Sequence, residues 1–374
     1  MNAMLLEDCC EILDNLRVPI TASERKSGPY PYYGANGIQD YVDEYIFDDE
    51  LVLLAEDGGN FGSKTRPIAY RVSGKCWVNN HAHVLKPKPG LDVDFLCYSL
   101  MFYKTDGLVN GATRQKLTQA TMRKMLIPNM TLENQRIVVD KLNRVLSIKS
   151  KREKQLVKLD ELIKARFIEM FGDPISNTKG WNMVELGELT GIGSSKRIFE
   201  KEYVSEGIPF YRTKEIVELS KGNNISTELY ISEERFAEIK EQYGVPKAGD
   251  LLISAVGTIG IIWIVDGKND FYFKDGNLIR VDGSDTFDSI YMKNLLEHLI
   301  SEYKKQMSSG TAYAALTISG MTKMKVYDVP LNLQVQFSDF VKQVDKSKVV
   351  VPSKIKNAIF AIMLSVSFGQ ITSI

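Results

Sequence analysis

The spacing of apolar residues divides the chain into strand-rich and helical parts. Short apolar runs bounded by Asp and Gly, at 51–55 and 251–255, predict buried strands. After Thr131 the apolar residues follow a 4,3,4,3 spacing instead, and no Gly or Pro interrupts residues 131–171. This pattern predicts one helix of roughly 60 Å whose apolar seam requires a coiled-coil partner.

A second helical series near the end of the chain supplies the expected partner. The apolar seam of the first series consists of Val138, Leu142, Val145, Leu156, Leu159, Ile163 and Met170. The second series has the same spacing and consists of Phe337, Val341, Val344, Ile355 and Ile362. Pro352 interrupts it and is expected to kink or break the helix. We predict two antiparallel helices that pair as a coiled coil.

One scheme of short motifs occurs twice along the chain. The matched motifs are Pro31-Tyr32-Tyr33 with Pro209-Phe210-Tyr211, Gly59-Asn60-Phe61-Gly62 with Gly257-Thr258-Ile259-Gly260, Gly111 with Gly310, Leu117-Thr118 with Leu316-Thr317, and Leu132-x-x-Gln135 with Leu333-x-x-Gln336. Two copies of this length predict two similar domains rather than a solenoid.

These patterns together predict an α+β fold with a pseudo-two-fold internal repeat. Two strand-rich domains are separated by two long antiparallel helices. We expect the first domain at 1–130, the first helical region at 131–173, the second domain at 174–330 and the second helical region at 331–374. Gly172-Asp173-Pro174 should end the first long helix.

Composition and charge narrow the class of protein. A length of 374 residues allows two or three domains with their own cores. Lys+Arg and Asp+Glu both number 47, which argues against a uniformly basic nucleic-acid binder but leaves room for local basic faces. The four cysteines lack metal-like or disulfide spacing, and no signal peptide or membrane span is evident. We expect a cytoplasmic protein with no membrane partner.

The sequence offers little support for a catalytic or metal site. It lacks a Walker loop, an Asn-Pro-Pro-aromatic motif and a Gly-x-Ser-x-Gly elbow. Acidic clusters such as Glu56-Asp57 are interpreted as turn and solvent residues rather than nuclease ligands. His81-x-His83 would place two imidazoles on one face of a strand. The only other histidine is His298, and the second copy is expected to have Gly276-x at that place. We therefore expect no metal, no cofactor and no catalytic residue in this chain.

Several loops combine basic, aromatic and small polar residues, as DNA contacts require. Phosphate contacts position a protein, whereas Arg and Gln have the geometry to read guanine and adenine. The candidates in the first copy are Lys64, Arg66, Arg114, Gln115 and Lys116. Those in the second copy are Arg212, Thr213, Lys214, Thr258, Lys274, Thr311 and Tyr313. For each of these residues, an ordinary surface position explains its presence about as well as a DNA contact does. Because the matched loops read Arg-Gln-Lys and Tyr-Ala-Ala, two such readers would recognise different half-sites.

The order and duplication of these motifs resemble the DNA-specificity subunit of type I restriction-modification enzymes. The resemblance is carried by Tyr32-Tyr33-Gly34-Ala35-Asn36-Gly37-Ile38, residues 111–118, Leu132-x-x-Gln135-Arg136-Ile137-Val138, Phe167-x-x-Met170-Phe171-Gly172-Asp173-Pro174, Trp181-x-x-Val184-x-Leu186-Gly187 and Phe337-Ser-Asp-Phe-Val341. It implies two target-recognition domains that each read half of a split double-stranded DNA site, with the helices setting the unread spacer. Pro352 and the uncharged tail after it depart from the family pattern.

The resemblance also implies partners and an absence of catalysis. Two modification (methyltransferase) subunits would dock on the helical region and methylate adenine with S-adenosylmethionine. Restriction subunits would add translocation and cleavage driven by ATP and Mg. Two alternatives stay open: a coiled-coil scaffold without DNA specificity, and an enzyme with a cryptic carboxylate-metal nuclease site.

Overall fold

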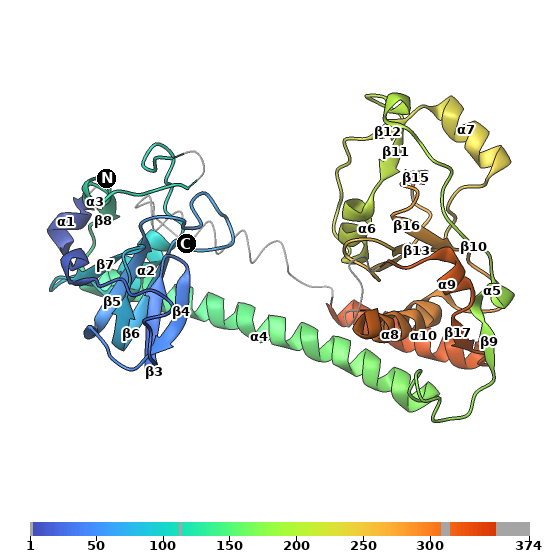
Figure 1. The fold of residues 1–374 in the computed structure, drawn as a ribbon, viewed down its shortest axis with the longest axis horizontal. Helices are drawn as coiled ribbons and strands as arrows, with labels where there is room; N and C mark the ends of the chain where they lie inside the picture. Colours follow the sequence, from blue (N-terminus) through green and yellow to red (C-terminus); the bar gives the residue numbers. More distant parts are fainter. Residues whose placement is uncertain (1–2, 112–113, 308–314, 349–374) are drawn as a thin grey trace. The chain divides into compact units, whose positions relative to one another are not determined.

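The computed structural model describes residues 3–111, 114–307 and 315–348 (Figure 1). The described residues form two compact units, one built from residues 3–154 and the other from residues 155–348. Six residues named from the sequence lie outside the described residues: Gly310, Thr311, Tyr313, Pro352, Ile355 and Ile362.

The first unit is built on a six-stranded sheet of order β2-β7-β5-β6-β3-β4. The strands are β2 (Cys10–Ile12), β3 (Ser27–Gly34), β4 (Gly37–Val42), β5 (Phe47–Ala55), β6 (Ala69–Val78) and β7 (Ala82–Pro87). Neighbours are antiparallel except for β3 and β6, which are parallel. The predicted strand at 51–55 is confirmed as the second half of β5, where every side chain is fully buried.

Short helices complete the first unit. They are α1 (Leu6–Cys9), α2 (Val93–Met101) and α3 (Gln119–Arg123), with a 3-10 turn η1 at Asp14–Leu16, and β1 (Ala3–Leu5) pairs with β8 (Leu126–Pro128). Helix α2 packs on β5, β6 and β7 and buries Phe95 and Leu96 against the sheet. The Asp92 carboxylate begins α2 because it accepts hydrogen bonds from the N–H groups of Asp94 and Phe95.

The second unit repeats this frame with more insertions. Its strands are β9 (Met183–Glu185), β10 (Ile192–Gly193), β11 (Ile208–Tyr211), β12 (Tyr230–Ile231), β13 (Leu251–Ser254), β14 (Ile262–Ile264), β15 (Tyr272–Phe273), β16 (Leu278–Val281) and β17 (Lys325–Tyr327). Its helices include α5 (Leu186–Leu189), η2 (Glu200–Glu202), α6 (Thr213–Ser220), α7 (Glu233–Gln242), α8 (Ser289–Met307) and α9 (Ile318–Thr322). The sheets have the orders β10-β16-β13-β14 and β12-β11-β15, and β17 pairs with β9.

Strand pairing confirms the internal repeat. In the first unit, Tyr32 and Tyr33 of β3 pair in parallel with Trp77 and Val78 at the end of β6. In the second unit, Phe210 and Tyr211 of β11 pair in the same parallel sense with β15. The single long strand β6 therefore corresponds to β14 and β15 together. The polar, Gly-containing segment 266–270 separates those two strands, since it cannot continue a buried strand.

A buried glutamine corrects the predicted alignment of the helical regions. The side-chain oxygen of Gln135 accepts from the Asp92 N–H at 2.7 Å, and that of Gln334 accepts from the Asp288 N–H at 2.9 Å. Both glutamines are buried, whereas Gln336 is exposed. Our match of Gln135 with Gln336 is therefore wrong, and Gln334 is its structural equivalent. Each glutamine ties a long helix to the start of its domain's sheet-covering helix.

The long uninterrupted helix is present as α4 (Leu132–Phe171), which has 40 residues. It ends at Gly172, whose φ of +80° favours glycine and whose N–H donates to the Ile168 carbonyl at 2.8 Å. The seam residues of its first half belong to the first unit: Val138 and Leu142 are buried in that core, and Val145 packs against it. Within the described residues, these positions therefore pack on their own domain.

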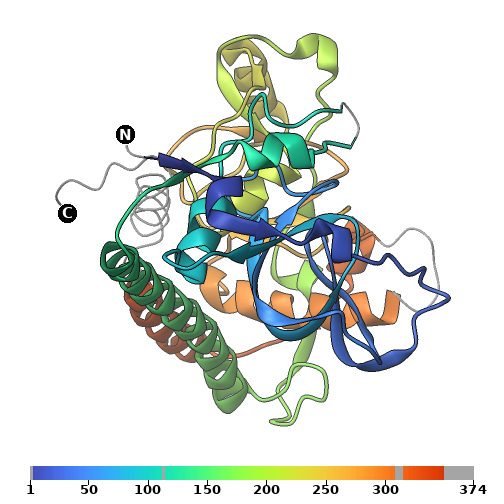
Figure 2. The same ribbon diagram turned by 90° about the vertical axis from the view of Figure 1, so that its left-hand side faces the viewer.

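Helix α10 (Leu331–Lys348) lies antiparallel to the C-terminal part of α4 (Figures 1 and 2). Phe337 contacts the ring of Phe167, and Lys348 pairs with Asp160 at 2.8 Å. The seam residues Ile163, Phe337, Val341 and Val344 are buried in this core, Leu159 and Met170 pack against it, and Leu156 is half-buried.

Two fully buried aromatic residues of α4 were missed by the seam pattern. Phe167 and Phe171 are fully buried, whereas the seam had placed Met170 at the interface. Their rings pack on Tyr291 of α8 at 5.8 and 4.9 Å between centroids. The buried stripe shifts because the end of α4 packs on the second domain as well as on α10, and this widens the buried face beyond a two-helix seam.

Candidate nucleic-acid interface

In the first unit, two loops that carry the candidate residues lie against each other. The Gly58 N–H donates to the Gln115 carbonyl at 3.1 Å, and the Leu117 N–H donates to the Glu56 carbonyl at 2.7 Å. Asn110 and Lys116 exchange backbone hydrogen bonds of 3.0 and 2.7 Å. Asn110 and residues 115–117 are therefore fixed beside the glycine turn that follows β5.

Acidic residues at the end of β5 hold the basic side chains of this loop. Arg114 Nη2 lies 3.0 Å from Asp57 Oδ1, and Lys116 Nζ lies 3.0 Å from Glu56 Oε1. The side chains of Arg114 and Lys116 remain 60% and 51% exposed, so they reach solvent while they are paired. Glu56 and Asp57 thus act as counter-charges to basic loop residues. Gln115, Lys64 and Arg66 are also exposed.

One candidate of the second unit, Arg212, forms an ion pair within the protein. The Arg212 N–H and guanidinium donate to the Glu215 carboxylate at 2.9 and 3.1 Å, and Glu215 is only 2% exposed. These bonds raise the pKa of Arg212 above its ordinary value and fix the first turn of α6. Thr213 is half-buried, whereas Lys214 is exposed. Within this set, Lys214 has the exposure that a DNA contact needs.

The remaining described candidates of the second unit flank the same strand ends. Thr258 is exposed in the turn between β13 and β14, where its carbonyl accepts from the Ser254 hydroxyl. The Lys274 N–H donates to the Tyr211 carbonyl at 2.8 Å, and this bond places Lys274 next to the start of α6. Arg197, which the sequence reasoning missed, lies 2.7 Å from Asp275 and is 65% exposed. Its only signal in the sequence is the adjacent basic pair 196–197.

His83 of β7 and His81, which directly precedes this strand, bind separate carboxylates. His81 Nδ1 lies 2.6 Å from Asp57, and His83 Nδ1 lies 2.6 Å from Asp14. Across the described ranges, the one His/Cys/Asp/Glu group close enough to share a metal ion is Asp14, Glu56 and His83. The ligand atoms of this group are already engaged by protein partners, including Arg17 at 2.7 Å from Glu56. We therefore assign it no metal.

Backbone hydrogen bonds also correct the predicted counterpart of this histidine pair. The Glu56 N–H donates to the His81 carbonyl at 2.9 Å, and the Ala255 N–H donates to the Asn277 carbonyl at 2.8 Å. Asn277 and Ile279 therefore occupy the places of His81 and His83 in the second unit. Our expectation of Gly276-x there is wrong by one residue.

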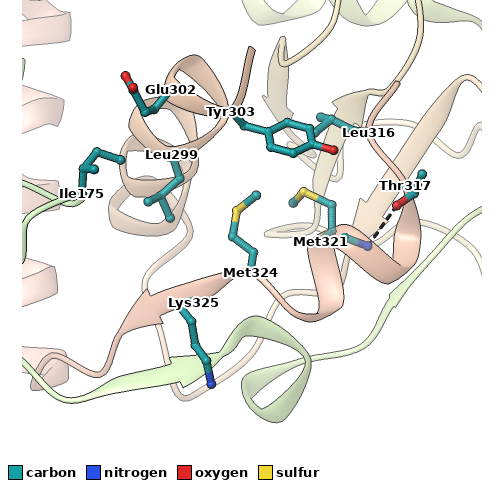
Figure 3. A pocket seen from close by; sticks show the side chains of 10 residues that line it. Ile175, Leu299, Glu302, Tyr303, Leu316, Thr317, Met321, Met324 and Lys325 are labelled. Carbon is teal, nitrogen blue, oxygen red and sulfur yellow. Dashed lines mark hydrogen bonds between the residues drawn. The ribbon is translucent and has the colours of Figure 1, made fainter. Parts of the chain in front are cut away.

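A pocket of about 480 Å³ lies within the second unit between α8 and α9 (Figure 3). Its lining is largely apolar and includes Tyr303, Met321 and Met324. The Thr317 hydroxyl, at its edge, accepts from the Gly320 N–H at 3.0 Å and begins α9. No histidine or cysteine is among its described lining residues.

No helix in the described part of the chain is both long and apolar enough to cross a membrane.

Comparison with known proteins shows the family. Residues 1–159 and 178–360 each match the model of the type I restriction modification DNA specificity domain. The chain belongs to this family. It is 35% identical over 334 residues to S.HindORF215P of Haemophilus influenzae, which is named as a type I restriction enzyme specificity subunit, and the match covers 88% of this chain and 83% of that protein. The EcoprrI specificity subunit of Escherichia coli matches 113 residues at 25% identity, covering 30% of this chain and 27% of that subunit.

Solved structures share the fold of this specificity-family chain. The S subunit of a type I restriction-modification system from M. genitalium has a TM-score of 0.55 at 15% identity, covering 98% of this chain and 94% of that one. A chain from a structure of a type I restriction-modification system has a TM-score of 0.57 at 17% identity, covering 98% and 97%. The predicted α+β fold with two repeated strand-rich domains is thus confirmed.

The two specificity domains share a frame but differ in surface chemistry. The frame is common to both: the Leu117 N–H bonds to the Glu56 carbonyl, and the Leu316 N–H bonds to the Ala255 carbonyl at 3.0 Å. Before these leucines the sequences read Arg-Gln-Lys at 114–116 and Tyr-Ala-Ala at 313–315. At the matched place in the sequence, one copy therefore has two cations around a glutamine, and the other has an aromatic residue followed by two alanines.

Proposed function

We propose that this chain is the non-catalytic, sequence-specific DNA-binding subunit of a type I restriction-modification enzyme. Each target-recognition domain reads one half of a bipartite, asymmetric double-stranded DNA site. The observation that carries the proposal is the repeated frame with unlike loop chemistry in a member of the specificity family. Two readers that differ at equivalent loops recognise different bases, and together they specify a longer site than either one alone.

In the first domain, loops 57–66 and 110–117 form the reading surface. Arg114 and Gln115 are the side chains suited to bidentate contacts with base edges, and Lys64, Arg66 and Lys116 are suited to phosphates. In the second domain, Lys214, Thr258 and Lys274 serve with Thr311 and Tyr313, while Arg212 stabilises the loop from within. Because carboxylates neutralise the cations of this loop, its non-specific attraction to DNA is weak. A DNA site is favoured when its own groups can replace the carboxylates as partners of these cations.

The helical region sets the distance between the two half-sites. Helix α4 has 40 residues, or roughly 60 Å of rise, against roughly 34–36 Å for one turn of duplex DNA. Two modification subunits dock on this region and restriction subunits join them. S-adenosylmethionine, ATP and Mg belong to those partners, this chain binds no cofactor, and the assembly works in the cytoplasm.

Domain exchange tests this function. Residues 1–130 are replaced by the corresponding domain of another family member, and methylated adenines are mapped across the genome in cells with and without the gene. One half of the methylated motif should change while the other half and the gap remain. A contiguous motif, or a motif that changes in both halves, contradicts the proposal.

Salt dependence separates the specificity subunit from a protein-assembly scaffold. Binding to the mapped duplex should weaken steeply with salt, with a logarithmic slope of roughly −0.9 for each phosphate neutralised. The matched control is the same duplex with both half-sites scrambled. Binding that ignores both salt and sequence favours the scaffold, and metal-dependent cleavage by the purified chain favours a nuclease.

A further inference from the structure

The first domain contains a buried ion cluster directly beneath the proposed reading loop. His83 is 0% exposed, and its Nδ1 lies 2.6 Å from Asp14 Oδ2. Its Nε2 lies 2.9 Å from the carbonyl oxygen of Leu117, the residue that ends the loop. The same imidazole ring therefore contacts a buried carboxylate on one side and the recognition loop on the other.

The hydrogen bonds of this cluster define its protonation. A carbonyl oxygen only accepts, so Nε2 must carry a proton. Asp14 accepts from the Val84 N–H and from the Gln119 side chain, both at 2.9 Å, so it is ionised and Nδ1 must also carry a proton. Burial raises the pKa of Asp14, but its bond to His83 and the charge of His83 outweigh burial and lower it. His83 is consequently a buried imidazolium.

Charged groups from several elements face this imidazolium. Glu56, which follows β5, lies 3.7 Å from Nδ1, and Arg17, which follows η1, pairs with Glu56 at 2.7 Å and with Asp14 at 3.6 Å. Lys116 of the loop completes the set through Glu56. With His83 charged, the cluster contains three cations, His83, Arg17 and Lys116, and two carboxylates, Asp14 and Glu56. Within the cluster, only His83 donates a hydrogen bond to the Leu117 carbonyl.

The second domain lacks this cluster. By strand register and the matching backbone hydrogen bonds, the places of Asp14, Glu56 and His83 are taken by Ser194, Ala255 and Ile279. Ile279 is 3% exposed and belongs to the apolar core. Equivalent loops are thus anchored by an ion network in one domain and by apolar packing in the other.

We infer that His83 is a positioning residue for DNA reading by the first domain alone, because its Nε2–H holds the Leu117 end of loop 110–117. This inference rests on the proposed function. Loss of the His83 proton leaves a ring nitrogen lone pair facing either the Leu117 carbonyl or the Asp14 carboxylate, and both contacts are repulsive. Removal of this donor therefore weakens reading of the first half-site, while reading of the second half-site is unaffected.

The test measures half-site discrimination by the full chain. Fluorescence anisotropy is recorded on the mapped duplex and on duplexes with either half scrambled. The main variant is His83→Ile, which copies the second domain. It should lose about tenfold or more of the discrimination at the first half-site, the loss expected for one charge-assisted hydrogen bond. Discrimination at the second half-site should be retained.

Matched variants separate positioning from folding. Asp14→Asn removes the carboxylate that accepts from Nδ1 and should weaken discrimination at the first half-site while that at the second half-site is retained. Ile279→Val is the control in the second domain and should leave discrimination at the first half-site unchanged.

Several results would overturn the inference. The inference is rejected if the wild-type chain discriminates at both half-sites and His83→Ile does so equally well. If the wild-type chain discriminates at neither half-site, the proposed function is rejected instead. An independent readout is the nitrogen NMR spectrum of the chain, which has 3 histidines. A neutral His83 tautomer at pH 7 would refute the positioning mechanism whether or not DNA binds.

Discussion

The buried amide of Gln334 provides a sharp test of the corrected repeat. Its oxygen accepts from the Asp288 N–H at 2.9 Å, and its nitrogen donates to the Val329 carbonyl at 2.7 Å. The change Gln334→Leu keeps a side chain of similar size but removes both hydrogen bonds. The matched control is Gln336→Leu, because Gln336 is exposed on the same helix and is the residue that the sequence pattern had paired with Gln135.

The expected magnitude follows from the two bonds. Each contributes roughly 0.5–1.5 kcal/mol net, and leaving a buried N–H and a buried carbonyl without partners adds to the loss. The free energy of unfolding of the second unit should therefore fall by about 2–4 kcal/mol. A change at an exposed position such as Gln336 should stay within roughly 0.5 kcal/mol.

Urea unfolding of the full chain can measure this difference. In a Trp77→Phe background, Trp181 and Trp263 report on the second unit. A loss of about 3 kcal/mol lowers the midpoint by about 1 M for a slope near 3 kcal/mol per molar. Equal midpoints for Gln334→Leu and Gln336→Leu would show that the buried amide does not stabilise the junction and that the structural alignment of the two copies is wrong.

Two further changes test other parts of the molecule. The pKa values of Asp14 and Glu56 are lowered from the ordinary 3.8 and 4.5: burial raises them, but hydrogen bonds from His83 to Asp14 and from Arg17 to Glu56 outweigh it. The two carboxylates therefore stabilise the fold at pH values above their ordinary pKa values, and this stabilisation is lost as pH falls through their lowered pKa values. Trp77 fluorescence should accordingly report a lower urea midpoint at pH 3 than at pH 6. This difference should be smaller in Asp14→Asn. Four residues inserted after Ser150, slightly more than one helical turn, add about 6 Å to α4. Methylation mapping should then show a gap longer by about two base pairs with both half-sites intact. An unchanged gap would refute the spacer role of α4.

Local sequence rules were sufficient for the frame of the fold. Some features depend only on neighbouring residues, so the sequence alone can indicate them. These features are the runs of β-forming residues at 51–55 and 251–255 and the helix-capping residues Thr118 and Thr317. The alignment of Gln135 failed because Leu-x-x-Gln occurs in two overlapping phases, at 331–334 and 333–336, and only burial distinguishes them.

Features that depend on distant partners could not be derived. The aromatic contacts of Phe167 require α8, and the bond between His83 and Asp14 joins residues that are 69 positions apart. The pairing of Arg212 with Glu215 is local, and the three-residue spacing at the start of a helix could have revealed it. The individual DNA contacts and the seam assignments beyond Lys348 stay predictions.

The unequal connections between matched strands have a consequence for how new variants arise. Between β3 and β5 the first domain has one hairpin strand, β4, whereas between β11 and β13 the second domain carries α6, β12 and α7. Each excursion leaves the strand that pairs in parallel, β3 or β11, and ends at the matched antiparallel strand, β5 or β13. A foreign segment inserted there needs only to connect the ends of two strands. Large changes in the length and sequence of this segment can therefore be tolerated without changes to the core. Recombination at these positions can diversify the protein faster than point mutation.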